Sequence, residues 1–249
     1  WRDIKLQQIT QIIEACAGLY LEASASGSTA VPNSEIELDM EVITRNAEAN
    51  IFLESISFQT DKMLTVTKQL ALENNKRERF KQTLQLTDMK YTDPYWLQND
   101  WSLGMYDVKD QELIGNPETP RSVRVSFNLT IDEQNISIEK DVIYRYSRRD
   151  KGELYEPFEI LPRVTTKLKE KVMLFSDNQA KKVAVSVRSG ANNVKGSLSL
   201  DVPAGWTVSP KFKEISIQQK GDEQWHEFLV TPSQNESEGK LKASVTING

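Results

Sequence analysis

The sequence predicts an all-β protein: two β-sandwich domains of the immunoglobulin-like kind, preceded by one N-terminal amphipathic helix. Three observations in the 249 residues predict it. Apolar and polar residues alternate with a period of two over many short segments, which is typical of half-buried strands. Clusters of Gly, Pro, Asn and Asp separate these segments, as in a sandwich or barrel. The alternation restarts on a second plan near residue 162, which indicates a domain boundary.

Residues 2–23 are predicted to form the helix. Their large apolar residues and one cysteine recur at helical spacing and form one broad face, which must be buried against something. These residues are Ile4, Leu6, Ile9, Ile12, Ile13, Cys16, Leu19 and Tyr20. We expect Cys16, which lies between two alanines, to be a small buried core residue rather than a reactive thiol. The chain opens with Trp1 and no methionine, so we expect a cut from a longer protein. We therefore assign residues 1–27 to a helix that links to, or packs on, a missing upstream domain.

Residues 28–162 are predicted to form the first β-sandwich domain. Its clearest strand runs over residues 123–131, where apolar residues occupy every second position. Similar alternation marks residues 36–42, 64–70 and 142–146, and turn residues gather at 73–75 and 115–117. The number of short strands favours a sandwich over a fold that alternates strands and helices.

Residues 163–249 are predicted to form the second, immunoglobulin-like β-sandwich domain. We expect Val172 and Leu174 to lie on its first strand. Further strands are expected at residues 183–187, 198–202, 215–217, 225–230 and 241–247. Trp206 follows a turn of Pro203, Ala204 and Gly205, and we expect it to cap one end of the sandwich rather than to meet a ligand. About six or seven strands in a segment of this length fit an immunoglobulin-like sandwich.

Charge and composition exclude several classes of function. The net charge of −5 and pI of about 5.2 leave no basic footprint for nucleic acid. No run of about 18 apolar residues is present, so we expect no membrane span. A single cysteine excludes a framework of internal disulfides.

The sequence offers little material for catalysis. Its only histidine, His226, lies in a strand pattern and is expected to be structural, which leaves no Ser-His-Asp triad or histidine metal site. We therefore predict no catalytic residue, no metal ligand and no enzyme activity for this chain by itself. One alternative is a glycosidase-like acidic pair, which needs only an acid and a base at suitable separation. Its candidates, which surface or turn positions also explain, are Asp88, Asp93, Asp100, Asp107 and Asp110.

The densest aromatic run spans residues 91–106. Within it, Tyr95, Trp96 and Trp101 are the candidate carbohydrate-binding residues, because an exposed ring face matches the C–H face of a sugar. The alternative is that these rings fill a core or an interdomain contact, since each buries a large area.

Two sets of motifs resemble known families. Residues 202–210, VPAGWTVSP, resemble the α-galactosidase-associated (NPCBM-associated) sandwich domain, in which a Pro-x-Gly-Trp-x-Val element precedes the last strands. The first part of the chain is similar to the region that follows the catalytic domain in bacterial (Bacteroides-type) PIG-L, or LmbE-like, deacetylases. The matching segments are residues 12–23 (IIEACAGLYLEA), 42–46 (VITRN), 95–97 (YWL), 113–117 (LIGNP) and 149–157 (RDKGELYEP).

The PIG-L resemblance implies zinc-dependent removal of an N-acetyl group from an amino sugar. The family's zinc ligands come from a His-Pro-Asp-Asp type motif and a later histidine, and this sequence contains neither. It therefore implies a non-catalytic accessory region without a cofactor, with zinc expected only in the missing upstream domain. That domain of the same polypeptide is the expected partner, glycans are a further one, and the location is secreted, periplasmic or on a bacterial cell surface. The alternative is a stand-alone carbohydrate-binding or adhesion module.

Overall fold

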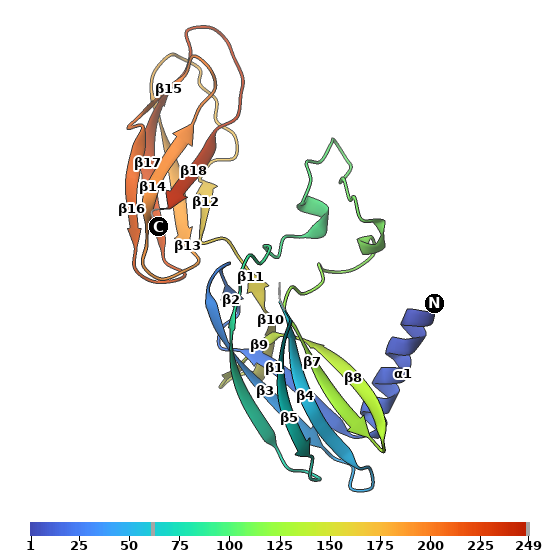
Figure 1. Cartoon of the computed structure of the whole chain (residues 1–249). Helices are drawn as coiled ribbons and strands as arrows, with labels where there is room; N and C mark the ends of the chain where they lie inside the picture. The colour runs from blue at the N-terminus through green and yellow to red at the C-terminus, as the bar shows by residue number, and fades with distance from the viewer. Residues whose placement is uncertain (61–62, 248–249) are drawn as a thin grey trace. The chain divides into compact units, whose positions relative to one another are not determined.

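A computed structural model describes residues 1–60 and 63–247 and confirms the predicted all-β fold with one N-terminal helix (Figure 1). The chain divides into two compact units, Trp1–Leu161 and Pro162–Gly249. Each unit contains packed sheets of mainly antiparallel strands around its own apolar core, which is the architecture of an immunoglobulin-like sandwich.

The first unit has two large sheets. One has the strand order β10-β9-β1-β3-β6, and the other has the order β5-β4-β7-β8. The strands of the first sheet are β1 (Leu19–Ala25), β3 (Glu35–Thr44), β6 (Glu78–Gln85), β9 (Ile143–Arg148) and β10 (Gly152–Pro157). Those of the second are β4 (Ile51–Gln59), β5 (Met63–Ala71), β7 (Arg124–Ile131) and β8 (Gln134–Asp141). A short parallel pair, β2 (Thr29–Ala30) and β11 (Glu159–Ile160), lies beside them.

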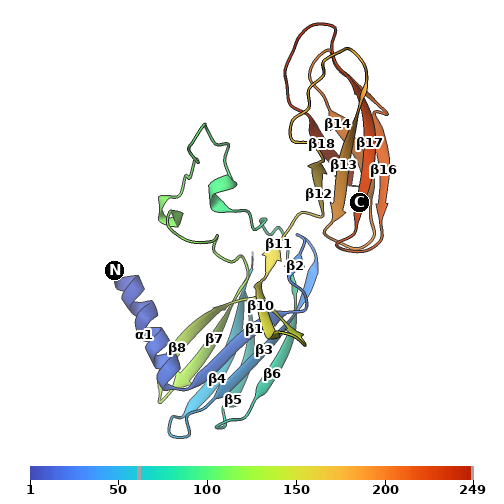
Figure 2. The same ribbon diagram turned by 180° about the vertical axis from the view of Figure 1, so that it is seen from behind.

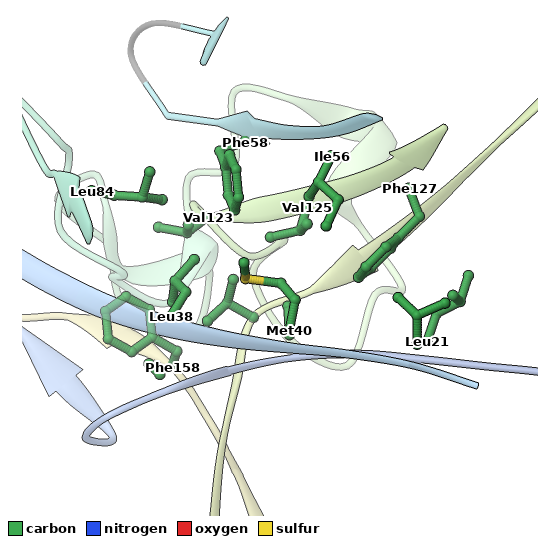
Figure 3. Close-up of a cluster of buried hydrophobic side chains, with 14 of the residues drawn as sticks. Leu21, Leu38, Met40, Ile56, Phe58, Leu84, Val123, Val125, Phe127 and Phe158 are labelled. Atoms are coloured by element: carbon green, nitrogen blue, oxygen red, sulfur yellow. The ribbon is translucent and has the colours of Figure 1, made fainter. Parts of the chain in front are cut away.

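The core of this unit lies between the two sheets. Leu38 and Met40 of β3 point toward Ile56 and Phe58 of β4, and Phe127 of β7 lies in the same layer (Figure 3). All five side chains are almost completely buried. The strict alternation read over residues 123–131 sends every second side chain into this layer, because successive residues of a strand point to opposite faces.

The helix is shorter than predicted. Helix α1 spans Arg2–Cys16, and the expectation that it continues to residue 23 is wrong, because residues from Leu19 onward form β1 and pair with β3. The chain leaves the helix at Gly18, whose φ of +58° favours glycine and is typical of the residue that ends a helix. A β-carbon at Gly18 would also lie 3.1 Å from the backbone carbonyl carbon of Arg45.

The apolar face of the helix has no cover within the described part of this chain, and the expected core position of Cys16 is wrong. None of residues 2–16, all of which the structure describes, is buried, and Cys16 is exposed rather than a core residue. Only the C-terminal end of α1 is attached to the sheets. Glu14 forms a 2.5 Å ion pair with Lys140 of β8, and Asn46 donates to the carbonyl of Cys16. Figures 1 and 2 both show α1 beside β8, with its N-terminal end pointing away from the strands.

The second unit has a four-stranded sheet of order β12-β13-β17-β15 and a three-stranded sheet of order β16-β14-β18. Val183, Val185, Leu198 and Phe228 contribute to the buried core between them. The strands are β12 (Val164–Leu168), β13 (Lys181–Ser189), β14 (Val194–Asp201), β15 (Thr207–Ser209), β16 (Phe212–Ile217), β17 (Glu223–Thr231) and β18 (Lys242–Ile247).

The first strand of this unit is not the one predicted. Val172 and Leu174 lie in the connection between β12 and β13 and are largely exposed. The first strand is instead β12, which pairs with β13 along its whole length, from Val164 opposite Ser189 to Leu168 opposite Val185. Two apolar residues two apart do not distinguish a strand from a loop, whereas partners on a neighbouring strand do.

A long connection joins β6 to β7 in the first unit. Residues 87–122, here called the 87–122 loop, contain two short 3₁₀ turns, η1 (Tyr95–Leu97) and η2 (Gln111–Leu113). Figures 1 and 2 show this loop extending away from the strands. Among the described residues, no helix has the length and apolar character needed to cross a lipid bilayer.

Candidate functional site

Tyr95 of the predicted aromatic site is buried and holds two parts of the 87–122 loop together. Its side chain is only 8% exposed, and its hydroxyl donates a 3.1 Å hydrogen bond to the carbonyl of Asn116. Its backbone N–H donates to Thr119 Oγ1 at 2.9 Å. Tyr95 therefore fixes the loop and offers no free ring face to a sugar.

The two tryptophans of the predicted site are placed differently from each other. Trp96 is partly exposed and meets the Tyr95 ring edge to face, with ring centres 4.9 Å apart. Trp101 is 64% exposed, and no aromatic pair among the described residues includes it. The structure therefore joins Tyr95 to Trp96 and leaves Trp101 on the exposed part of the loop, beside exposed Leu103 and Met105.

Large apolar side chains are exposed on α1 and on the 87–122 loop of the first unit. Figures 1 and 2 show the N-terminal end of α1 and this loop both extending beyond the strands. We call their exposed apolar residues the apolar side. Its members on α1 are Ile4, Leu6, Ile9, Ile12 and Ile13, and those on the loop are Leu97, Trp101, Leu103, Met105, Tyr106 and Ile114. Exposed apolar residues that group together mark interaction surfaces more often than single scattered ones do.

A hollow of about 650 Å³ lies at one end of the second unit. Three connections line it: residues 172–178, Trp206, and residues 232–239. Trp206, which was expected to cap a sandwich end, does so and also forms part of this hollow. Its ring meets Phe175 edge to face at 4.8 Å, and its Nε1 donates to Ser237 Oγ at 3.0 Å. The indole is therefore held in one orientation by an aromatic contact and a hydrogen bond.

The rim of the hollow is polar. Asn178 donates to Gln234 Oε1 at 3.1 Å, which links two of the three connections, and Ser233 and Ser237 share a 2.9 Å hydrogen bond. An aromatic floor with amides and hydroxyls around it is the usual chemistry of a site that binds a small polar molecule with apolar faces. Sequence reasoning did not assign this site, because the three connections are far apart in the chain.

Two of the five aspartates considered as an acidic pair have local structural roles. Asp110 accepts from the backbone N–H of Glu112 at 3.0 Å and caps η2, and Asp107 forms a 2.6 Å ion pair with Lys109. Nowhere in residues 1–60 and 63–247 do three or more His, Cys, Asp or Glu side chains form a group that could hold a metal ion.

The buried carboxylates lie elsewhere, on the outer face of the five-stranded sheet. Glu22 and Glu41 are both nearly buried, and sequence reasoning missed them because only strand pairing brings them together. Tyr20 donates to Glu22 at 2.6 Å, and burial together with this bond raises the pKa of the Tyr20 phenol far above its usual value. Arg145 contacts both carboxylates. The cluster is an ion-pair network across β9, β1 and β3.

Comparison with known proteins gives distant structural likenesses. The chain matches no protein-family model, and no curated protein sequence is significantly similar to it. Red sea bream transglutaminase is similar with a TM-score of 0.39 and 10% identity, over 96% of this chain and 31% of that protein. A Salmonella alpha-2-macroglobulin is similar with a TM-score of 0.32 and 9% identity, over 92% of this chain and 15% of that protein. The E. coli alpha-2-macroglobulin is similar with a TM-score of 0.30 and 10% identity, over 92% of this chain and 15% of that protein.

This chain thus spans less than a third of each of these proteins. At these identities the likeness concerns the β-sandwich fold alone. No family model supports the resemblance to PIG-L deacetylases or to the NPCBM-associated domain, which rests on short sequence motifs.

Proposed function

We propose that this chain is the non-catalytic accessory region of a secreted PIG-L-type N-acetyl-sugar deacetylase, and that its first unit packs against the upstream zinc domain. The apolar side of the first unit is the observation that carries the proposal. Folding normally buries such side chains, at roughly 1.5–3 kcal/mol for each large one. A neighbouring domain that packs on these side chains would explain why they are apolar although they are exposed in this chain.

Helix α1 is the centre of this contact. Ile9, Ile12, Ile13 and Cys16 are three or four residues apart and share one face of the helix. A surface helix in a globular domain normally turns such a face toward a core, yet here the whole face is exposed. The segment that resembles the PIG-L region begins within this helix, at Ile12.

Hydrogen exchange in the parent protein tests the proposal. The source reading frame is sequenced upstream of Trp1, and the longer protein and this chain are then compared by amide exchange. We expect a His-Pro-Asp-Asp type motif upstream and slower exchange of residues 2–16 in the longer protein. Residues 212–217 of β16, in the other unit, serve as the internal control. A frame without the motif, or identical exchange of α1 in both proteins, overturns the proposal.

The hollow at Trp206 favours a second function, carbohydrate binding by the second unit. Its aromatic floor can stack on a sugar ring while Asn178 and Gln234 bind hydroxyl groups. Titration with a panel of neutral oligosaccharides tests this function. We expect Gln234→Ala to weaken binding without changing the fold, and Gln218→Ala, on the chain beyond β16, to leave binding unchanged. A panel without a binder contradicts it.

A further inference from the structure

The outer face of the four-stranded sheet in the second unit carries an exposed tryptophan. Along β17, Phe228 and Val230 point into the core, whereas Trp225, Glu227 and Leu229 point outward. Trp225 is 54% exposed although it lies in the middle of a regular strand. Nothing in the core requires an indole at this position.

Strand register places Trp225 in a row with two residues of the neighbouring strands. Trp225 is opposite Ser186 of β13, and Ser186 is opposite Lys167 of β12. Ser186 is on the outer face, yet it is only 4% exposed. Direct cross-strand neighbours have β-carbons about 4.5–5.5 Å apart, so the side chains of Trp225 and Lys167 cover Ser186 from both sides. Trp225 nevertheless keeps 54% of its surface exposed.

Trp225 stands between the outward carboxylates Glu223 and Glu227 on its own strand, and positive charge lies on the neighbouring strands. The outward side chains of β12, its continuation and β13 include four cations, Lys167, Lys169, Lys182 and Arg188, all exposed. The outward carboxylates of this sheet are Glu223 and Glu227 on β17, which leaves a surplus of two positive charges.

One of these cations is already paired. Lys182 forms a 3.0 Å ion pair with Glu227, and Lys182, helped by Lys213 and Lys169, lowers the pKa of the Glu227 carboxyl. Within the part of the chain that the structure describes, no salt bridge engages Lys167, Lys169 or Arg188. These three cations form no salt bridge there, and Arg188 is directly opposite Glu223 of β17.

We propose that this outer face binds an acidic polysaccharide, with a sugar ring on Trp225 and anionic groups paired with Lys167, Lys169 and Arg188. Trp225 and Lys167 are two strand spacings apart, about 10 Å. A flat polymer that crosses the strands therefore meets the ring first and the cations next. The proposal is independent of the accessory role and of the Trp206 hollow, which is lined by other residues.

An acidic glycan fits this face better than a nucleic acid does. A surface that binds single-stranded nucleic acid normally combines a continuous basic groove with several aromatic rings on which successive bases stack. Here one ring and a short row of cations are present, which matches a polymer with spaced charges.

Binding of fluorescent oligogalacturonide to the full chain tests the proposal, with the fully methyl-esterified oligomer as the neutral control. We expect the acidic oligomer to bind, the ester to bind at least about tenfold more weakly, and added salt to weaken the acidic complex. Trp225→Ala and the double variant Lys167→Ala/Arg188→Ala should each lose about tenfold. Phe212→Ala and Lys195→Ala, exposed positions on the other sheet, are the matched controls and should bind normally.

Circular dichroism confirms that each variant is folded before binding is compared. Equal affinity for the acid and its ester, or unchanged binding by folded Trp225→Ala, overturns the proposal. So does the absence of binding to both oligogalacturonide and a heparin oligosaccharide. Tighter binding of single-stranded DNA than of either acidic sugar would assign the face to nucleic acid instead.

Discussion

Glu22 and Glu41 are direct cross-strand partners on β1 and β3, and both carboxylates are nearly buried. Like charges directly opposite each other destabilise a sheet. Arg145 compensates, because its guanidinium lies 3.1 Å from Glu22 and 3.8 Å from Glu41. Arg77 lies 2.9 Å from the other oxygen of Glu41. The outer face of this sheet thus depends on arginine to hold two carboxylates together.

Arg145→Met should therefore destabilise the first unit strongly. The substitution leaves two buried carboxylates without their shared cation, and loss of one partner of a buried ion pair costs about 3 kcal/mol or more. Urea unfolding of the full chain, followed by circular dichroism, measures the change in the free energy of unfolding. Glu41→Gln in the Arg145→Met background should recover part of the loss. Lys81→Met removes an exposed pair with Glu37 and should cost less than about 1 kcal/mol. Equal losses for Arg145→Met and Lys81→Met would contradict this interpretation.

Gly18→Ala should destabilise the junction of α1 and β1. The φ of +58° disfavours any residue with a β-carbon by about 1–2 kcal/mol, and the added carbon would press on the backbone of Arg45. Gly27→Ala is the control, because the φ of Gly27 is not left-handed and the space around this glycine is open. Thermal unfolding should show a lower midpoint for Gly18→Ala and little change for Gly27→Ala. A Gly18→Ala protein as stable as the parent would mean that the chain ends the helix in another way.

Stability of the second unit should decrease as the pH falls below about 6.5, the ordinary pKa of histidine. Burial, and to a lesser extent Lys213, lowers the pKa of His226, and its Nε2 is buried without a hydrogen-bond partner in the described residues. The unfolded chain then binds a proton that the folded chain resists, so the stabilisation is complete above the unfolded pKa and is lost as pH falls toward the folded pKa. Urea midpoints at pH 7.5 and pH 5.5 measure how steeply stability depends on pH, and His226→Gln should make this dependence weaker. If the substitution leaves the pH dependence of stability unchanged, other titratable groups cause it.

The aromatic residues of the 87–122 loop should separate into structural and exposed members. Tyr95→Phe removes the hydrogen bond to Asn116 and should cost about 1 kcal/mol. Trp101→Ala removes an exposed ring and should change stability by less than about 0.5 kcal/mol. Proteolysis of the loop under native conditions should be faster in Tyr95→Phe only. Faster cleavage of Trp101→Ala as well would show that the Trp101 ring also stabilises the loop.

Local patterns were sufficient for the strands and insufficient for the helix boundary. Residues 123–131 could be identified from alternation alone, because that pattern records which side of a strand faces a core. The end of α1 was missed although Gly18 was visible as a helix-ending signal, because apolar spacing continues through Leu19 and Tyr20 into β1. Cys16 was expected to be buried because helical spacing shows that an apolar face exists and does not show what covers it.

The candidate sites were accessible from sequence only in part. Trp206 could be placed at a sandwich end, and Trp101 could be named as an aromatic candidate, from their neighbours in the chain. The hollow around Trp206, the pairing of Glu22 with Glu41 and the row from Trp225 to Lys167 join segments that are distant in sequence. The fold class follows from the sequence, because burial on one side of a strand leaves a period of two in the residues. The sites follow from the three-dimensional arrangement, because strand register and loop clustering depend on contacts between segments that no local period records.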